Sequence, residues 1–358
     1  MCLVNACASS GRDGPALQER VWPVYLGRAS RAGGADTLTS NPQPVWRTSV
    51  ARGISGAPAL AEDVIALSLV DNRLALLDRP TGAVIWTRRL SGPLGAGPLI
   101  ADDRVFVAEQ QVDGRVHAIR LLNGTTIWSA RAGDVVAPLV LEDSALYVAS
   151  VEGQVGSIAS ATGRYRWRTR VGGAVRATPL LAPAGLVVAT QMDSLFLLDD
   201  QSGAIRVRRG TRGTVLAAPA LSDSTIVIGT TAGRLEALNA ATLQTRWSLD
   251  LGDIIVGNVA VQDGRAYAMT GRGTLVIVPL GRPEGARRVD VGIIARAGPT
   301  PAAQGIFLGG VRGEIALVDS LGVHKWDARI LAPVAEAVVV DGRTLIAVSV
   351  RGDVVMFR

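Results

Sequence analysis

Residues 123–162 read NGTTIWSARAGDVVAPLVLEDSALYVASVEGQVGSIASAT, and this stretch decides the fold. Short apolar runs alternate with turn residues, which predicts four antiparallel strands at 125–131, 138–141, 145–150 and 154–159. The pattern begins again at Thr162-Gly163, so the repeating unit is about 40 residues long. The turns within and before it are Asn123-Gly124, Glu142-Asp143 and Glu152-Gly153.

The same unit recurs along the chain, and three kinds of residue mark it. A tryptophan stands in the last strand of most units, with Val207 and Arg288 where it is missing. A proline marks the first strand, and a glycine or Asx residue marks the central hairpin. A four-stranded unit of about 40 residues is typical of a β-propeller blade, so eight units predict an all-β, eight-bladed propeller of four-stranded antiparallel blades. The tryptophans are Trp46, Trp86, Trp128, Trp167, Trp247 and Trp326.

The two ends of the repeat predict how the ring closes. We name the strands of a blade A to D from the axis outward. The chain ends in a strand C, residues 353–358, and the first strand D, residues 45–50, precedes any blade. We predict that these strands pair and complete the last blade, which removes the open sheet edges that favour aggregation. Residues 44–358 would then form one propeller domain.

Composition fits such a fold and excludes other classes. Hydrophobic residues make up 48% of the 358 residues but aromatic residues only 4%, so Val, Leu, Ile and Ala would fill the sheets. No apolar run approaches the ~20 residues of a membrane helix. The net charge of +6 comes almost wholly from arginine. Because no basic run is interleaved with aromatic residues, nucleic acid is not expected as a partner.

The N-terminal segment differs from the repeats. Leu3-Val4-Asn5-Ala6-Cys7 resembles a bacterial lipobox, so we expect residues 1–7 to be the remnant of a lipoprotein signal peptide and Cys7 to be the lipidated residue. Residues 8–43 are rich in Gly and Pro and are predicted to form a flexible tether. The alternative is a cytosolic start with two incidental cysteines, Cys2 and Cys7.

Residue types that often carry chemistry do not converge in this sequence. His117 and His324 fall on distant blades, and neither has a cluster of His, Asp and Glu residues around it in the sequence. The glycine-rich segments 271–273 and 309–313 coincide with predicted hairpins. The tripeptide 351–353 (RGD) is a hairpin as well. Strand A, which would line the central channel, carries small or apolar residues rather than acids and bases. We therefore expect no catalytic, cofactor-binding or metal-binding residues, and no enzyme.

The segment Thr81-Gly82-Ala83-Val84-Ile85-Trp86 resembles the repeat of pyrroloquinoline-quinone-type propellers. Quinoprotein dehydrogenases of that type carry a vicinal cysteine pair and a set of calcium ligands. This chain has no cysteine after Cys7, so the resemblance extends to the repeat and does not imply the cofactor.

Residues 44–358 are also similar to a second family, the B subunit of the outer-membrane β-barrel assembly (Bam) complex. The shared features are an N-terminal lipobox-like cysteine, a tether, eight blades and a C-terminal strand such as 351–358. The resemblance implies a non-enzymatic, lipid-anchored scaffold on the periplasmic side of the outer membrane, a monomer within its complex. Its partner would be the periplasmic domains of the barrel-assembly core protein. Val175-Arg176, in the loop after Trp167, fits the Leu-Arg step through which that family binds its partner.

Charge patterning predicts which side of the ring meets a partner. Arginines including Arg176 and Arg212 fall on the side that carries the B–C hairpins and D–A loops, whereas turn carboxylates fall on the other. We expect a disc with a basic and an acidic side, the basic side receiving the partner. Two alternatives stay open: a quinone- or ligand-binding enzyme that uses the central channel, and a general extracytoplasmic interaction or sensor module.

Overall fold

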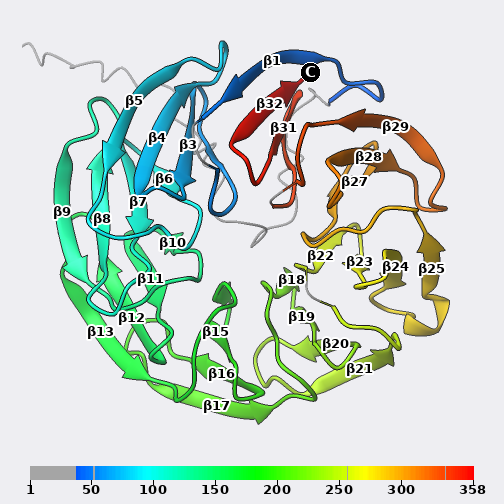
Figure 1. Ribbon diagram of the computed structural model, residues 1–358. Coiled ribbons are helices and arrows are strands. Elements are labelled where there is room, and N and C mark those ends of the chain that lie inside the picture. The colour runs from blue at the N-terminus through cyan, green and yellow to red at the C-terminus, as the bar shows by residue number, and fades with distance from the viewer. Residues whose placement is uncertain (1–37, 51–52, 256, 335) are drawn as a thin grey trace, which may run out of the picture.

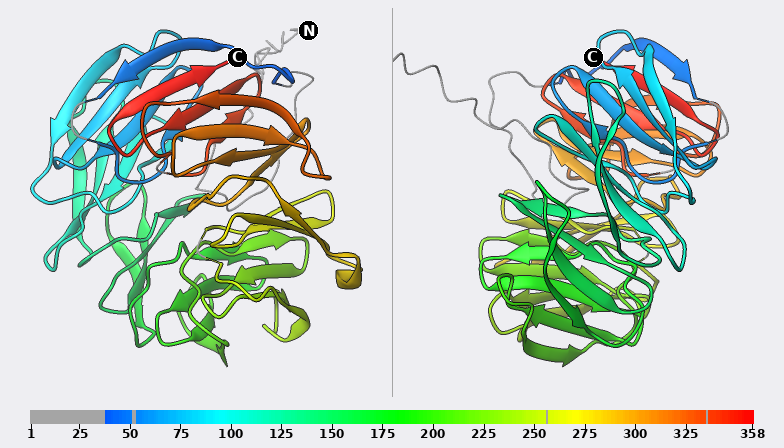
Figure 2. Two further views of the ribbon diagram at one scale, coloured as in Figure 1. Left: turned by 45° about the vertical axis from the view of Figure 1, so that its right-hand side comes forward. Right: turned by 90° about the vertical axis from the view of Figure 1, so that its left-hand side faces the viewer.

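The computed structural model describes residues 38–50, 53–255, 257–334 and 336–358. In these residues the strands form eight four-stranded antiparallel sheets arranged around a central axis (Figure 1), which confirms the all-β, eight-bladed propeller. Figure 2 shows the same ring from two other directions as a disc of packed blades.

The first four blades follow one another along the chain. Blade 1 contains β2 (Ala59–Leu60), β3 (Val64–Leu69), β4 (Arg73–Asp78) and β5 (Val84–Arg89). Blade 2 contains β6 (Leu99–Ala101), β7 (Arg104–Ala108), β8 (Arg115–Arg120) and β9 (Thr126–Arg131). Blade 3 contains β10 (Val140–Glu142), β11 (Ala145–Ala149), β12 (Gln154–Ala159) and β13 (Tyr165–Arg170). Blade 4 contains β14 (Leu180–Ala182), β15 (Gly185–Thr190), β16 (Ser194–Leu198) and β17 (Ile205–Gly210).

The other four blades complete the circle. Blade 5 contains β18 (Ala220–Ser222), β19 (Thr225–Gly229), β20 (Arg234–Asn239) and β21 (Thr245–Asp250). Blade 6 contains β22 (Ala260–Gln262), β23 (Arg265–Met269), β24 (Thr274–Pro279) and β25 (Arg287–Asp290), with a short 3-10 helix η1 (Pro283–Gly285) before β25. Blade 7 contains β26 (Thr300–Ala302), β27 (Gly305–Gly309), β28 (Glu314–Val318) and β29 (His324–Arg329). Blade 8 contains β30 (Val339–Asp341), β31 (Thr344–Val348), β32 (Asp353–Phe357) and β1 (Pro44–Ser49).

The ring closes through the two ends of the described chain, as expected. β1 pairs antiparallel with β32, with Trp46 opposite Met356 and Ser49 opposite Asp353. Two hydrogen bonds between the backbones of Gln43 and Arg358 extend this ladder, at 2.8 and 2.9 Å. The closing strand therefore covers residues 44–49 rather than 45–50.

Residues at the end of the expected tether also contact the ring. Leu38 is only 2% exposed and packs with Phe307 and Trp326 between blades 7 and 8. Its carbonyl accepts a hydrogen bond from the side chain of Gln304, in the A–B turn of blade 7. In the other blades a C–D turn occupies this place, but in blade 8 the turn is interrupted by the chain ends. Leu38 fills the space that the missing turn would leave.

Neighbouring blades are held together by a repeated bond. The indole N–H of Trp167, on the outer strand of blade 3, donates to the carbonyl of Asp200 in blade 4 at 2.8 Å. Indole groups in such positions bury a large apolar ring and still satisfy their polar atom. Equivalent bonds run from Trp46, Trp86, Trp128 and Trp247 to the next blade.

At the two positions without tryptophan, arginine side chains make contacts between blades. Beside Val207, Arg209 of blade 4 forms an ion pair with the buried Glu236 of blade 5 at 2.7 Å. Arg288 of blade 6 turns back to blade 5 instead and donates to the carbonyl of Asp250 at 2.6 Å. Between blades 6 and 7, the His324 side chain lies 3.0 Å from the carbonyl of Val291. The indole bond therefore recurs at five junctions, and other contacts join the remaining blades.

Candidate docking face

One face of the ring carries all the D–A loops and B–C hairpins, and we call it the hairpin face. The opposite face carries the A–B and C–D turns, and we call it the turn face. In every blade the first hairpin residue donates a backbone hydrogen bond to a D–A loop carbonyl, which establishes equivalent positions around the ring. These bonds are Val70–Gly53, Gln110–Pro93, Val151–Asp134, Gln191–Ala174, Thr231–Thr214, Gly271–Ile254, Val311–Ile294 and Val350–Pro333.

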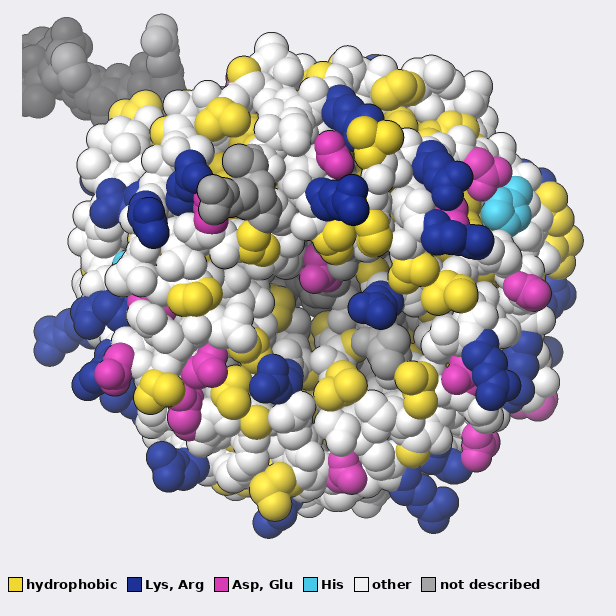
Figure 3. Space-filling view, in the orientation of Figure 1, with side chains coloured by type: hydrophobic (Ala, Val, Ile, Leu, Met, Phe, Trp, Pro, Cys, Tyr) yellow, Lys and Arg dark blue, Asp and Glu magenta, His cyan; other side chains and the backbone are white. Residues whose placement is uncertain are grey.

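The centre of the hairpin face is hollow (Figure 3), and a cavity of about 360 Å³ lies along the axis. Its wall consists largely of Gly, Ala and Pro because the D–A loops approach one another closely there. A side chain at Gly97, for example, would come within 2.2 Å of the Ala57 carbonyl. Two arginines, Arg176 and Arg296, line this cavity. They occupy equivalent loop positions, because each comes two residues after a carbonyl (of Ala174 or Ile294) that accepts the repeated hairpin hydrogen bond.

The structure places the predicted site residues in different environments. Val175 is fully buried between blades 3 and 4 and packs in one cluster with Tyr147 and Trp167, so its side chain supports the loop from beneath. Arg176, the next residue, is exposed at the cavity, and Arg212 is exposed on the next D–A loop. Cys7 lies outside the described residues.

The basic side also carries carboxylates, which pair with several of its arginines. The pairs are Arg73–Asp71, Arg131–Asp113, Arg234–Asp250 and Arg312–Glu314. Among the arginines of the D–A loops and B–C hairpins, Arg176, Arg212, Arg272, Arg296 and Arg351 form no hydrogen bond or ion pair through their guanidinium groups within the described part of the chain. Together with the exposed Arg89 and Arg170 at the ends of β5 and β13, they carry the positive charge that this face offers to a partner.

A carboxylate beside Arg176 modifies this picture locally. Burial and the neighbouring Glu152 raise the pKa of Asp134, while Arg176 partly offsets the effect. The backbone N–H of Asp134 donates to both carboxylate oxygens of Glu152, at 3.2 and 3.3 Å. Asp134 and Glu152 both lie on the blade 3 side of Arg176. On the other side, the next D–A loop carries Arg212, which forms no ion pair in the described part of the chain.

A buried carboxylate organises the hairpin face at blades 1 and 2. Glu109 is fully buried and accepts hydrogen bonds from the backbone and hydroxyl of Ser91, from the Gly92 N–H and from the Arg115 N–H. Burial opposes ionisation, but these hydrogen bonds and nearby His117 outweigh it and hold the pKa of Glu109 below its usual value. His117 Nε2 lies 3.3 Å from a Glu109 oxygen, and burial lowers the pKa of His117. Glu109 thus joins a D–A loop to a B–C hairpin. The sequence did not reveal this role, because Gly92 and Ser91 lie 17 and 18 positions before Glu109 in the chain.

Exposed apolar side chains gather on the hairpin face and were also missed from the sequence. Ile254 and Ile294 were detectable, because the equivalent positions in blades 3 to 5 hold Asp134, Ala174 and Thr214. Apolar groups beside arginine and methionine are typical of protein–protein interfaces. The residues are Val70, Val112, Met192, Ile254, Ile294, Leu331 and Val350.

Within the described ranges, no group of three or more His, Cys, Asp and Glu side chains could hold a metal ion. In the same part of the chain, no helix has the length and apolar character needed to cross a bilayer.

The fold defines the class of protein: an eight-bladed propeller built from pyrroloquinoline-quinone-like repeats. A family model described as outer membrane protein assembly factor BamB matches residues 38–138, 112–194 and 184–284. These segments overlap and together cover more than half of the chain, and the chain belongs to the BamB family.

Two curated relatives show the distance within this family. The outer membrane protein assembly factor BamB of Legionella pneumophila (strain Paris) is 28% identical over 163 residues, which are 41% of this chain and 41% of the relative. BamB of Shewanella oneidensis is 28% identical over 177 residues, which are 45% of this chain and 42% of the relative. The chain therefore matches about two fifths of the length of these relatives.

Solved structures confirm the fold across nearly the whole chain. The crystal structure of BamB from Moraxella catarrhalis superposes with a TM-score of 0.75 at 15% identity, covering 88% of this chain and 99% of that one. The quinohemoprotein alcohol dehydrogenase of Comamonas testosteroni superposes with a TM-score of 0.77 at 12% identity, covering 94% and 80%. At these identities the likeness concerns the propeller alone.

Proposed function

We propose that this protein is a non-enzymatic scaffold that assists the assembly of outer-membrane β-barrel proteins from the periplasmic side. Its partner is the periplasmic part of the barrel-assembly core protein, which docks on the hairpin face. Membership in the BamB family supports the role. The observation that carries the docking site is that Arg176 and Arg212 are exposed on adjacent loops without an ion pair in the described part of the chain.

The rigidity of these loops supports the same site. Val175 is buried directly beneath Arg176, and its N–H donates to the Ser150 carbonyl at 3.2 Å. In the neighbouring loop, the Thr214 hydroxyl donates to the Asp193 carboxylate at 2.7 Å. Because both loops are held in place, the two guanidinium groups are preorganised for carboxylates on a partner, which reduces the entropic cost of binding.

Reversing both charges tests the proposal. The variant Arg176→Glu/Arg212→Glu should slow association with the core protein's periplasmic domains about tenfold at low salt, because surface charges act mainly on the rate of encounter. Surface plasmon resonance at two salt concentrations measures this rate. The control Arg164→Glu/Arg287→Glu makes the same change in net charge at exposed residues outside the hairpin face. Equal association rates for the first variant and the unmodified protein would refute the assigned site.

The membrane anchor is a separate part of the proposal. We place it at Cys7 because residues 3–7 resemble a lipobox. Intact-mass measurement of protein expressed from its native host should show an acyl adduct on Cys7. An unmodified cysteine at this position would exclude the anchor while leaving the docking proposal untouched.

A further inference from the structure

The apolar side chains on the hairpin face are concentrated on the side away from Arg176 and Arg212. Ile254 of blade 6, Ile294 of blade 7 and Leu331 and Val350 of blade 8 lie on consecutive blades and are 45%, 48%, 78% and 46% exposed. We call this set the apolar arc. Figure 3 shows hydrophobic and basic side chains interspersed around the upper and right-hand rim of the central hollow.

The repeat shows that the fold does not require these isoleucines. The carbonyls of Ile254 and Ile294 accept the same hairpin hydrogen bond as those of Asp134, Ala174 and Thr214 in blades 3 to 5. A half-exposed isoleucine therefore stands where other blades of the same chain use a small or polar residue in the same backbone geometry. Leaving large apolar groups in water is unfavourable, so contiguous ones usually mark an interaction surface.

The carboxylates near the arc already have hydrogen-bond partners. The carboxylate of Asp253 is occupied by the backbone N–H groups of Ile254 at 2.9 Å and Arg272 at 2.7 Å, which helps to keep its pKa low despite partial burial. Glu314 is likewise occupied by the backbone and side chain of Arg312.

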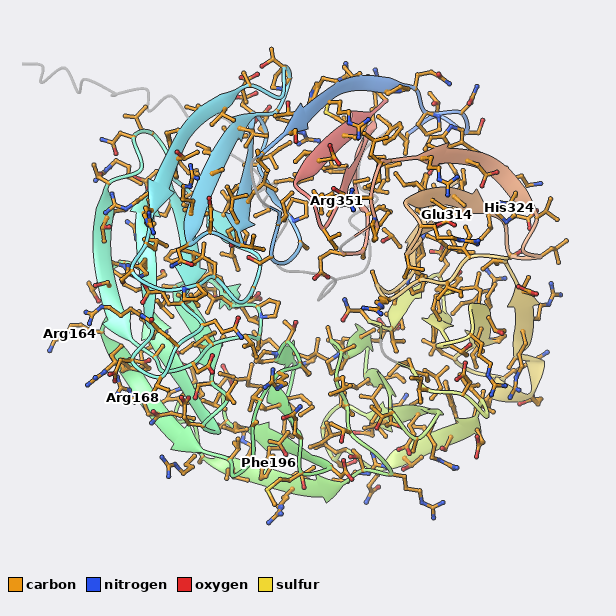
Figure 4. All side chains as sticks on the ribbon, viewed as in Figure 1. Arg164, Arg168, Phe196, Glu314, His324 and Arg351 are labelled. Atoms are coloured by element: carbon orange, nitrogen blue, oxygen red, sulfur yellow. The ribbon has the colours of Figure 1, made fainter. Side chains whose placement is uncertain are left out.

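The arginines of the arc are left without such partners. The guanidinium groups of Arg272, Arg296 and Arg351 form no hydrogen bond or ion pair with other described residues. Figure 4 labels Arg351 and Glu314 on the neighbouring blades 8 and 7. Asp253 partly offsets the charge of Arg272, so the arc combines exposed apolar groups with the positive charges of Arg296 and Arg351.

We propose that the apolar arc is a second binding surface, which takes an extended polypeptide segment of another protein carrying both apolar and acidic side chains. Charge complementarity selects this occupant, because Arg296 and Arg351 lie on the loop and hairpin of the arc and form no ion pair with a carboxylate of the described residues.

Fluorescence anisotropy with synthetic peptides tests this surface in the full-length protein. The probe is a labelled 12-residue peptide in which Leu and Glu alternate, and two further peptides replace Glu with Lys or Leu with Ser. The Leu/Glu peptide should bind, whereas the Leu/Lys and Ser/Glu peptides should bind at least about tenfold more weakly, because each lacks one of the two complementary features. Equal binding of all three peptides, or of none, would overturn the proposal.

Two variants locate the binding site. Ile254→Thr/Ile294→Thr introduces the residue that blade 5 carries at the same position, Thr214, and should weaken Leu/Glu binding about tenfold. The control Ile205→Thr removes an exposed isoleucine from outer strand β17 and should leave binding unchanged. Arg272→Glu/Arg351→Glu should shift the preference toward the Leu/Lys peptide. Retained Leu/Glu binding in the isoleucine variant would place the peptide elsewhere and refute the arc.

Two further results of these experiments would identify a different occupant of the apolar arc. If a peptide of residues 21–26 (VWPVYL) displaces the Leu/Glu probe at equal concentration, the arc belongs to the chain's own N-terminal segment and the proposal is wrong. If the isoleucine variant abolishes a concentration-dependent dimer, the occupant is a second copy. Capture of the barrel-assembly core protein should persist in Ile254→Thr/Ile294→Thr, which keeps failure of this inference distinct from failure of the Arg176 site.

Discussion

Val355→Pro should destabilise the ring by more than about 3 kcal/mol, since proline in a central strand removes a ladder hydrogen bond and places its ring against the neighbouring backbone. Val355 lies in β32, with Arg47 of β1 on one side and Ala347 of β31 on the other. β32 is the only strand that β1 pairs with in the described chain. A substitution in β32 that breaks its hydrogen bonds therefore disrupts both blade 8 and the closure of the ring.

Two matched variants separate the possible causes. Val355→Ala removes the side chain but keeps the backbone donor, and it should cost much less. Ala316→Pro places the same backbone lesion in the equivalent strand of blade 7, between Leu308 and Asp327. All four strands of blade 7 remain adjacent in the chain, whereas in blade 8 the partner strand β1 comes from the other end, so its release gains more chain entropy.

Denaturant unfolding and hydrogen exchange measure these differences. In Val355→Pro the amides of β1 should exchange much faster than those of β5 in blade 1, because β1 loses its only strand partner in the described residues. The newly exposed edges should also promote self-association. Equal stability of Val355→Pro and Ala316→Pro, with β1 still protected, would show that pairing of the chain ends contributes little to closure.

The repeat explains why the fold could be predicted from the sequence. Turn residues and tryptophans recur at a fixed spacing, and each blade repeats the same local structure. A unit with an unclear pattern can therefore be assigned from its alignment with the other units. Boundaries were less certain: strand A of blade 3 begins at Val140 rather than Pro138, because proline has no N–H for the ladder. Closure followed from the strand order alone, since an unpaired strand D at one end complements a missing one at the other.

The candidate site was less accessible to the same reasoning. Burial of Val175 could have been read from the repeat, because Val135, Val215 and Ile255 are apolar and buried at the equivalent position. The pairing of arginines and acids could not, because it depends on contacts between a loop and a hairpin. Arg131, for example, pairs with Asp113, 18 residues away. Periodicity identifies the scaffold, and departures from periodicity identify the surfaces that the scaffold presents.

Glu109→Ala should be the most damaging single substitution on the hairpin face. Glu109 replaces the serine or threonine that most hairpins carry at this position, such as Ser150 and Ser349, whose N–H groups make the same backbone bond to strand C. Its carboxylate holds Ser91, Gly92 and Arg115 in place without contact with solvent. Removing one partner of a buried charged network leaves several donors unsatisfied, so we expect a loss of about 3–5 kcal/mol near neutral pH.

The pH dependence identifies the carboxylate as the cause. The pKa of Glu109 is lowered in the folded protein, so its stabilisation is fully present above the unfolded value of 4.5 and is lost as the pH falls through the folded value. The difference in unfolding free energy between the unmodified protein and Glu109→Ala should therefore shrink as the pH falls below 4.5, whereas between pH 8 and pH 5 it should change only through the coupling of Glu109 to His117. Denaturant titrations across this range measure it. A difference that stays constant at acid pH would indicate lost packing rather than a lost charge.

A histidine control strengthens the assignment. Burial lowers the pKa of His117, so this residue contributes stability that declines as the pH falls below 6.5. The hydrogen bond to Asp327 raises the pKa of His324, so its contribution is full below 6.5 and is lost as the pH rises through the folded value. Because these are the two histidines of the chain, His117→Gln and His324→Gln should change the slope of stability with pH in opposite directions. Glu109→Ala should remove the part of the slope below pH 4.5 that Glu109 contributes and leave the His324 contribution intact, since His324 lies on a blade that Glu109 does not touch.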